Sequence, residues 1–175
     1  MSLTIPEIPT DDPRWTRRGA IYVPANGGVT RWVSGDVYST KVSHADTNGV
    51  FAFIEASVPA GAGPVAHTHN SNDEAFYLLS GELEFLDGDH TFVAQPGDFV
   101  YVPRNTRHRF KNIGAHTAKM VFMFTPAGPE RGFEIVGEPA QPGVQAPPPG
   151  MPTPEQMNEM MRPESKIDSI MMPES

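Results

Sequence analysis

The sequence contains no cysteine. The chain therefore has no disulfide framework, no thiolate metal site and no cysteine nucleophile. Its stability has to come from packing alone, and its 175 residues are enough for one domain with a substantial hydrophobic core. This composition is compatible with a reducing cytoplasm, which is the location we expect.

Long apolar runs and an excess of positive charge are also missing. No stretch approaches the ~18 consecutive apolar residues of a membrane span, and the first residues, MSLTIPEIPTDDP, lack a basic stretch followed by an apolar run. The 21 acidic side chains outnumber the 13 basic ones, and the resulting net charge of -8 repels a phosphate backbone. We therefore expect a soluble protein that binds neither membranes nor nucleic acids.

Helical periodicity is nearly absent between about residues 20 and 138, where glycine and proline divide the chain into short segments. The apolar runs of this region are short and rich in β-branched or aromatic residues, which favours strands. The predicted strands are AIYV at 20–23, FAFIEASV at 51–58, EAFYLL at 74–79, ELEFL at 82–86, FVYVP at 99–103 and KMVFMFT at 119–125. The pattern predicts an all-β domain over residues 1–138.

Residues 82–88 carry the clearest local pattern. In Glu82–Leu83–Glu84–Phe85 the strict alternation directs two carboxylates to water and two apolar side chains to the core. The Asp-Gly dipeptide at 87–88 is a typical turn of a β-hairpin. We predict a hairpin at this point.

The composition changes at about residue 139, since 11 of the 19 prolines lie in residues 126–175. We predict a second segment, 139–175, in which a proline-rich extended connector leads to one short helix at 153–162. Thr153 is the expected helix cap, followed by Pro154 and by Gln156, which returns the capping bond. Met157, Met160 and Met161 share one face of this helix. That face is expected to dock on the barrel or on a partner subunit in a homodimer, or to act as a lid.

A histidine pair marks the first stretch with chemical content, which runs from Gly61 to Gly81. His67 and His69 lie at i and i+2, so on an extended strand their imidazoles project to the same face and can converge on one metal ion. The turn residues 70–73 then reverse the chain and bring the Glu74 carboxylate back toward the same ion. A metal would compensate the burial of Glu74 in line with large apolar side chains.

The second stretch runs from Gly97 to Asn112. A strand ends at a turn centred on Pro103, and the next strand places His108, Phe110 and Asn112 on one face. The alternate positions are the basic residues Arg107, Arg109 and Lys111, which are expected in solvent. His108 therefore points inward.

Together the two stretches resemble the cupin superfamily. Its motifs G-x5-H-x-H-x3-4-E-x6-G and G-x5-P-x-G-x2-H-x3-N are matched from Gly61 to Gly81 and from Gly97 to Asn112, within a resemblance that covers roughly residues 30 to 138. Asn105 replaces the glycine of the second motif, and asparagine tolerates the left-handed backbone needed there. The resemblance implies a double-stranded β-helix, or jelly-roll barrel, with one divalent metal ion on His67, His69, Glu74 and His108.

Three imidazoles and one carboxylate leave one or two positions on the metal open, which favours an enzyme over a structural site. The ligand set accepts Fe, Ni, Mn, Co, Cu or Zn and does not distinguish them. The remaining histidines, His44, His90 and His116, lie in polar contexts near turns and are expected at the surface. Seven candidate inward side chains line either a pocket for a flat, aromatic small molecule or an ordinary core: Phe76, Leu78, Phe85, Phe110, Met120, Phe122 and Phe124.

A finer resemblance lies in residues 100–105 and in residues 124–133 followed by Gly137, which are similar to the quercetin 2,3-dioxygenase-like branch of the superfamily. That branch implies ring opening of a flavonol or related enol by O2, with Glu74 as ligand and general base. Single-domain cupins also include aromatic polyketide cyclases, in which the metal acts as a Lewis acid without redox change. A small-molecule binding protein is the third alternative, since one fold hosts many functions.

Overall fold

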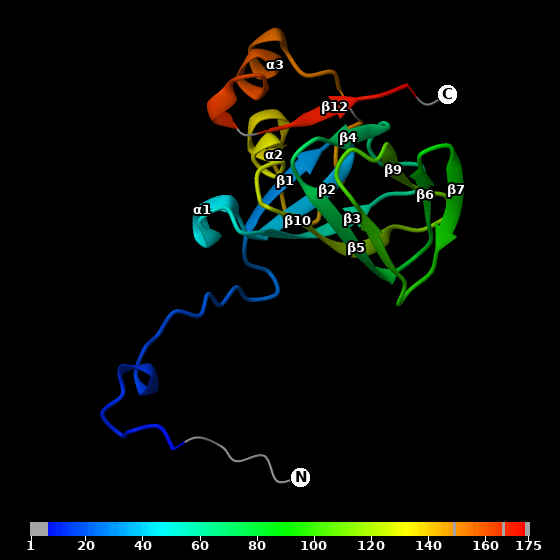
Figure 1. The fold of residues 1–175 in the computed structure, drawn as a ribbon. Helices are drawn as coiled ribbons and strands as arrows, with labels where there is room; N and C mark the ends of the chain where they lie inside the picture. The colour runs from blue at the N-terminus through cyan, green and yellow to red at the C-terminus, as the bar shows by residue number, and fades with distance from the viewer. Residues whose placement is uncertain (1–6, 149, 166, 174–175) are drawn as a thin grey trace.

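The computed structural model describes residues 7–148, 150–165 and 167–173. Among these residues the strands form two antiparallel sheets that close into a barrel (Figure 1). The described part of the first sheet has seven strands, in the order β11 (Glu138–Pro139), β1 (Val29–Val33), β2 (Asp36–Val42), β3 (Ala52–Val58), β10 (Ala118–Thr125), β5 (Asp73–Ser80) and β8 (Phe99–Val102). The described part of the second sheet has five strands, in the order β12 (Ser169–Met171), β4 (His67–His69), β9 (His108–Asn112), β6 (Leu83–Asp87) and β7 (His90–Ala94).

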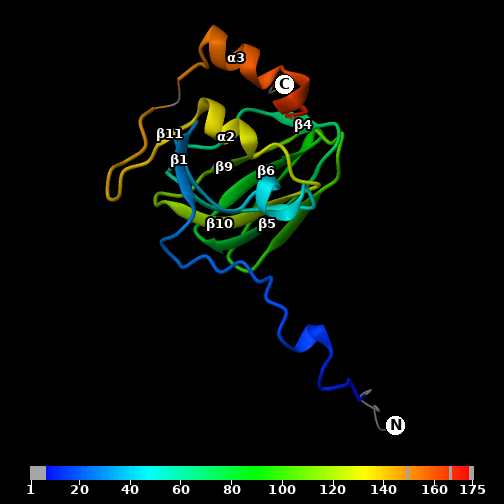
Figure 2. The ribbon, with the colours of Figure 1, turned by 90° about the vertical axis from the view of Figure 1, so that its left-hand side faces the viewer.

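Short helices precede, connect and follow the strands. They are α1 (His44–Thr47), α2 (Arg131–Val136), α3 (Pro154–Met160) and two 3-10 turns, η1 (Pro13–Trp15) and η2 (Pro163–Ser165). Helix α3 lies beside α2 on one side of the barrel, and residues 7–20 lead away from the barrel in both views (Figures 1 and 2). No helix in the described residues is long and apolar enough to cross a membrane.

The core fills the space between the sheets because the central strands alternate in burial. Every second side chain of β3 and of β10 is buried, which is the period of a strand with one solvated face. These side chains pack with the aromatic residues of β5, β6 and β9 in one hydrophobic cluster. The expected all-β jelly-roll barrel is confirmed.

Five of the six predicted strands are confirmed, as β3, β5, β6, β8 and β10. The alternation over 82–85 is also confirmed, since Leu83 and Phe85 are buried whereas Glu82 is exposed. The hairpin joins β6 to β7, but Asp87 pairs with His90, so the connecting residues are Gly88 and Asp89, one position later than predicted. Gly88 has φ 62, a conformation in which a residue without a Cβ is not strained.

The strand predicted at 20–23 is wrong. These residues form no strand, and Ile21 and Tyr22 are 54% and 87% exposed. The pairing of β1 begins only at Val29, after the turn at residues 25–26. Strand propensity describes how well a residue fits a surface that is paired and half buried. This segment has no neighbouring strand to pair with among the described residues, so its strand-forming residues remain unpaired.

The C-terminal segment carries the predicted helix and is joined to both sheets. Helix α3 begins with the predicted capping box, in which Thr153 Oγ1 accepts from Gln156 N and Gln156 Oε1 accepts from Thr153 N. Strand β11 pairs with β1, and β12 pairs with β4. The division expected after residue 138 falls inside β11, so the independent folding of the two segments stays a prediction.

The predicted methionine face of α3 does not pack on the barrel as a whole, and its docking on a partner subunit stays a prediction. Met160 is half-buried near Gly132, but Met157 and Met161 are 41% and 75% exposed. Gln156 Nε2 donates to the carbonyl oxygen of Ile135 at 3.0 Å, and this bond holds the face of residues 156 and 160 against α2.

One carboxyl group is buried in the core without a charged partner. Asp36, at the start of β2, is fully buried, and its Oδ2 accepts a hydrogen bond of 2.8 Å from the Tyr38 hydroxyl. Its Oδ1 has no hydrogen-bond partner among the described residues. Burial raises the pKa of Asp36 to about 7, against the smaller opposing effect of the Tyr38 hydrogen bond.

We predict that Asp36 makes the barrel less stable as pH rises. Because folding raises this pKa from 3.8 to about 7, the folded protein binds the proton more tightly, and the free energy of unfolding falls as pH rises from about 4 to about 7. The upper limit of the loss is about 4 kcal/mol. Asp36→Asn should remove this loss and be more stable than the wild type at pH 8. Urea unfolding at pH 5 and pH 8 with equal metal load measures it; the same pH dependence in both proteins would contradict it.

Candidate metal centre

Four side chains converge inside the barrel near one end of the second sheet. His67 and His69 come from β4, Glu74 from β5 and His108 from the first position of β9. One potential ligand atom from each of the four lies within 4.8 Å of the other three. Two ligands that each lie ~2.1 Å from one ion are roughly 3–4 Å apart, so small movements would bring all four onto one metal.

Local structure explains why these residues meet. His67 and His69 alternate with Thr68 on the extended β4, and His67 is the register partner of His108 across the β4–β9 pair. The turn between β4 and β5 is held by Asn72, whose Nδ2 donates to the carbonyl oxygen of Pro126 at 2.7 Å. Glu74 follows this turn and faces inward together with Phe76, as the sequence predicted.

Asn105, which replaces the glycine of the second motif, has the predicted left-handed backbone. Asn105 has φ 66, the left-handed conformation usually given to glycine. In this conformation its backbone N donates to the carbonyl oxygen of His69 at 2.8 Å. The turn before β9 is thereby fastened to the ligand strand, and His108 enters the barrel three residues later.

Each imidazole is oriented through its Nδ1 atom. His67 Nδ1 lies 2.8 Å from the carbonyl oxygen of Val65, and His108 Nδ1 lies 2.9 Å from that of Thr106. A carbonyl oxygen only accepts, so both Nδ1 atoms carry the proton and both Nε2 atoms are left for the barrel interior. His69 Nδ1 lies 2.8 Å from the hydroxyl oxygen of Ser169.

Glu74 is the charged centre of the group. It is 4% exposed, and its Oε2 lies 2.9 Å from His108 Nε2 and 3.2 Å from His69 Nε2. Burial acts to raise the pKa of Glu74, but the hydrogen bonds from His108 and His69 outweigh it and lower the pKa to about 2. Glu74 is therefore a carboxylate at neutral pH.

The pKa values of His67 and His108 are shifted in opposite directions. Burial and the positive charge of His108 lower the pKa of His67 to about 4, so His67 is neutral and its Nε2 lone pair is free to bind a metal. Burial acts to lower the pKa of His108, but the bond to Glu74 outweighs it and raises that pKa. Protons and a metal ion therefore compete for the same nitrogen.

The donor set fits a divalent transition metal. Three imidazole nitrogens and one carboxylate suit Fe, Ni, Mn, Co, Cu and Zn, and the backbone carbonyls behind His67 and His108 are the outer partners that metal-binding histidines usually have. The predicted residues could thus hold one ion.

The cupin domain family matches residues 54–124, the part of the chain that contains all four of these side chains. The chain belongs to the cupin family. The solved structure of a predicted oxalate decarboxylase from Thermotoga maritima has a TM-score of 0.55 to this cupin at 19% identity, over 60% of this chain and 98% of that one. This likeness concerns the fold alone.

Two curated relatives are similar over about the same length. Quercetin 2,3-dioxygenase of Bacillus subtilis is 32% identical over 123 residues, which are 69% of this cupin and 36% of the relative. The tetracenomycin polyketide synthase protein TcmJ of Streptomyces glaucescens is 28% identical over 123 residues, which are 70% of this cupin and 78% of the relative. The cupin therefore spans about a third of the dioxygenase and about three quarters of TcmJ.

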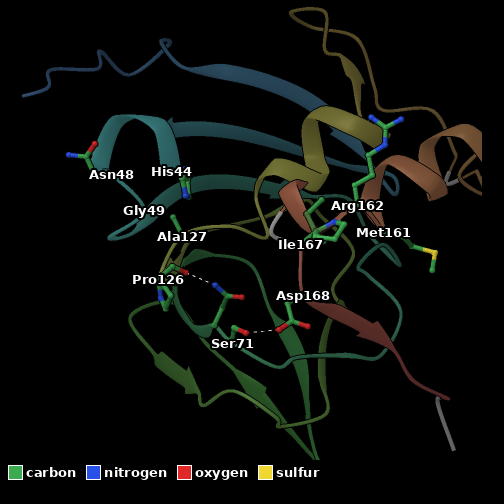
Figure 3. A pocket seen from close by; sticks show the side chains of 12 residues that line it. His44, Asn48, Gly49, Ser71, Pro126, Ala127, Met161, Arg162, Ile167 and Asp168 are labelled. Carbon is green, nitrogen blue, oxygen red and sulfur yellow. Dashed lines mark hydrogen bonds between the residues drawn. The ribbon is translucent and has the colours of Figure 1, made fainter.

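The seven residues predicted to line a substrate pocket are buried in one hydrophobic cluster, and two of them lie beside the ligand imidazoles. The Phe124 ring lies 5.3 Å from that of His69, and the Phe76 ring lies 6.5 Å from that of His108. A cavity of about 580 Å³ lies elsewhere, between α1, the turn after β4 and the C-terminal segment, lined among others by His44, Ser71 and Arg162 (Figure 3). Contact of the seven with a substrate stays a prediction.

Sequence reasoning missed Ser169 and Asp36. Ser169 is 100 residues from His69, and nothing in the tail sequence identifies its partner strand. The Asp36–Val37–Tyr38 spacing, which puts two polar groups on one face of a strand, is the only signal for the buried pair. Of the histidines expected at the surface, His90 and His116 are exposed and His44 is half-buried.

We predict that replacing His67 and His69 together with alanine abolishes metal binding. Two of the four ligands are lost, and metal affinity depends on their number and geometry. Elemental analysis of the purified variant measures the effect, with His90→Ala plus His116→Ala as a control that removes two histidines outside the centre. Full metal retention in the His67 and His69 variant would contradict the site.

Proposed function

We propose that this cupin is a metal-dependent enzyme that acts on a flat aromatic or enolisable small molecule, and that its reaction is a quercetinase-like dioxygenation with O2. The observation that carries the proposal is the Glu74 carboxylate, kept ionised by imidazoles beside the hydrophobic core of the barrel. The similarity to quercetin 2,3-dioxygenase supports the reaction type. One divalent ion is the proposed cofactor.

In this proposal Glu74 takes the proton from the substrate hydroxyl. A divalent ion bound here supplies Lewis acidity at an open coordination position. The hydrogen bonds that lower the pKa of Glu74 come from Nε2 of His69 and of His108, the atoms proposed as ligands. A divalent ion bound to these nitrogens would keep Glu74 ionised in their place, so Glu74 would be available to accept a proton from a substrate hydroxyl.

The aromatic residues around the centre are proposed to bind the substrate ring and exclude water. Phe76 and Phe124 lie beside two of the ligand imidazoles, and both rings are buried. Exclusion of water strengthens the electrostatic interactions between Glu74 and a substrate hydroxyl and protects a reactive ring from side reactions.

A second candidate is an aromatic polyketide cyclase without redox chemistry. It is supported by TcmJ, and this chain covers 78% of that relative but only 36% of the dioxygenase. Glu74 would again move a proton, now from the carbon next to a carbonyl group. A small-molecule binding protein is the third alternative, in which no turnover occurs.

Oxygen consumption separates these functions. We predict that the metal-loaded protein consumes O2 in proportion to flavonol turnover, as measured with an oxygen electrode and by loss of flavonol absorbance. Equal conversion of an enolisable polyketide substrate with and without O2 would favour the cyclase instead. Binding of either compound without conversion, at full metal occupancy, would support the binding protein.

A second prediction concerns Glu74 itself. Glu74→Gln keeps the size and a weak oxygen ligand but removes the charge, so metal content should fall modestly while turnover falls by roughly 10²–10⁴-fold. Metal content and kcat are measured on the same sample. Glu84→Gln is the matched control, because Glu84 pairs with Arg109 outside the core and its loss should leave kcat unchanged. Near-native turnover of metal-loaded Glu74→Gln would remove Glu74 as the base.

A further inference from the structure

The strand that carries two of the proposed ligands has little support from the rest of the barrel. Strand β4 has only three residues, and a single register pair, His67 with His108, joins it to β9. On its other side β12 pairs with all three residues, as Ser169 with His69, Ile170 with Thr68 and Met171 with His67. Most of the ladder that keeps β4 extended is therefore supplied by the C-terminal strand.

Side chains and backbone fasten β12 at both ends of β4. The Asp168 carboxylate accepts from Asn70 Nδ2 at 2.7 Å, just after His69. It also accepts from Ser71 Oγ at 2.5 Å (Figure 3). Beyond the other end, Met172 N donates to the carbonyl oxygen of Ala66 at 2.8 Å. These bonds fix the register that places Ser169 opposite His69.

Ser169 differs from the groups that orient the other two imidazoles. His67 and His108 are each held by the carbonyl oxygen two residues earlier in their own segment. His69 is held by a hydroxyl group from the far end of the chain, with Ser169 Oγ 2.8 Å from Nδ1. For His69 to offer the Nε2 lone pair to an ion, its proton has to be on Nδ1, where Ser169 Oγ can accept it.

We infer that Ser169 is a positioning residue of the metal centre and that docking of β12 and metal binding stabilise each other. The hydroxyl group holds the His69 ring in one orientation and can accept the Nδ1 proton when Nε2 binds an ion, and the ladder holds β4 extended. Coupling between two binding events is reciprocal, so a bound ion also has to strengthen the docking of β12. The inference rests on the metal centre proposed above and adds the C-terminal segment to it.

The first test measures the affinity of the full chain for Co²⁺ alone, by competition with a chelator and by the visible spectrum. Ser169→Ala should weaken binding by roughly 10–100-fold, the usual effect of removing an outer partner of a metal-binding histidine. Ile170→Ala is the matched control, because Ile170 lies on the same strand but is half exposed and pairs with Thr68. Its affinity should stay near that of the wild type.

The pair Ser169→Thr and Ser169→Val separates the hydroxyl group from strand formation. The two variants have the same shape and both favour a strand, but only threonine keeps the hydroxyl. The threonine variant should bind Co²⁺ roughly 10–100-fold more tightly than the valine variant, the same range as expected for Ser169→Ala. Circular dichroism checks that each variant is folded. If Ser169→Ala does not fold, the threonine and valine variants still test the role of the hydroxyl group.

Hydrogen exchange tests whether a bound ion strengthens the docking of β12. Co²⁺ should slow amide exchange of residues 168–173 in the wild type, and this effect should shrink in Ser169→Val. Equal Co²⁺ affinity of the threonine and valine variants, or exchange of this segment that ignores Co²⁺, would overturn the inference while leaving the metal centre intact. Failure of the wild type to bind Co²⁺ would overturn the centre and the inference together.

Discussion

The burial of the Glu74 carboxylate is the constraint on which the rest of the structure depends. A lone carboxylate in an apolar interior would take up a proton rather than remain charged, because the loss of hydration costs far more than packing returns. Here two imidazoles approach its Oε2 within 3.2 Å and hold it in the ionised form. The elements that carry those imidazoles therefore have to converge on β5, and the short β4, the turn after it and the start of β9 are arranged to make them do so.

The same contacts make the centre responsive to protons. Without a metal, His108 is favoured in its charged form because it donates from Nε2 to Glu74. A metal ion bound at this position would replace protons on the nitrogens and would compensate the charge of the carboxylate in their place, so metal binding would release protons and strengthen as pH rises. The rings of Phe76 and Phe124 beside these imidazoles are buried, and charges surrounded by apolar groups interact more strongly than charges at the surface.

Local pattern was enough to predict the centre, but not everything that supports it. The i and i+2 spacing of His67 and His69 and the left-handed position of Asn105 are properties of a few neighbouring residues, and both are confirmed. Residues 20–23 have the composition of a strand yet form none, because pairing depends on a neighbour that a sequence pattern does not identify. The pairing of Ser169 with His69 lies beyond local reasoning for the same reason, since the two are 100 residues apart.

The C-terminal segment extends a sheet as an edge strand, and this determines how it can act on the chemistry. An edge strand lies beside its neighbour, so β12 reaches the centre through its pairing with β4 and through the Ser169 hydroxyl group. Its influence is then limited to what one hydroxyl group and three register pairs can do, which is to hold an imidazole in one orientation and to accept its Nδ1 proton. That is the kind of contact in which small displacements matter, because metal affinity depends steeply on ligand geometry. A C-terminal segment that is distant in sequence can thus affect the metal affinity of a centre without contributing a ligand to it.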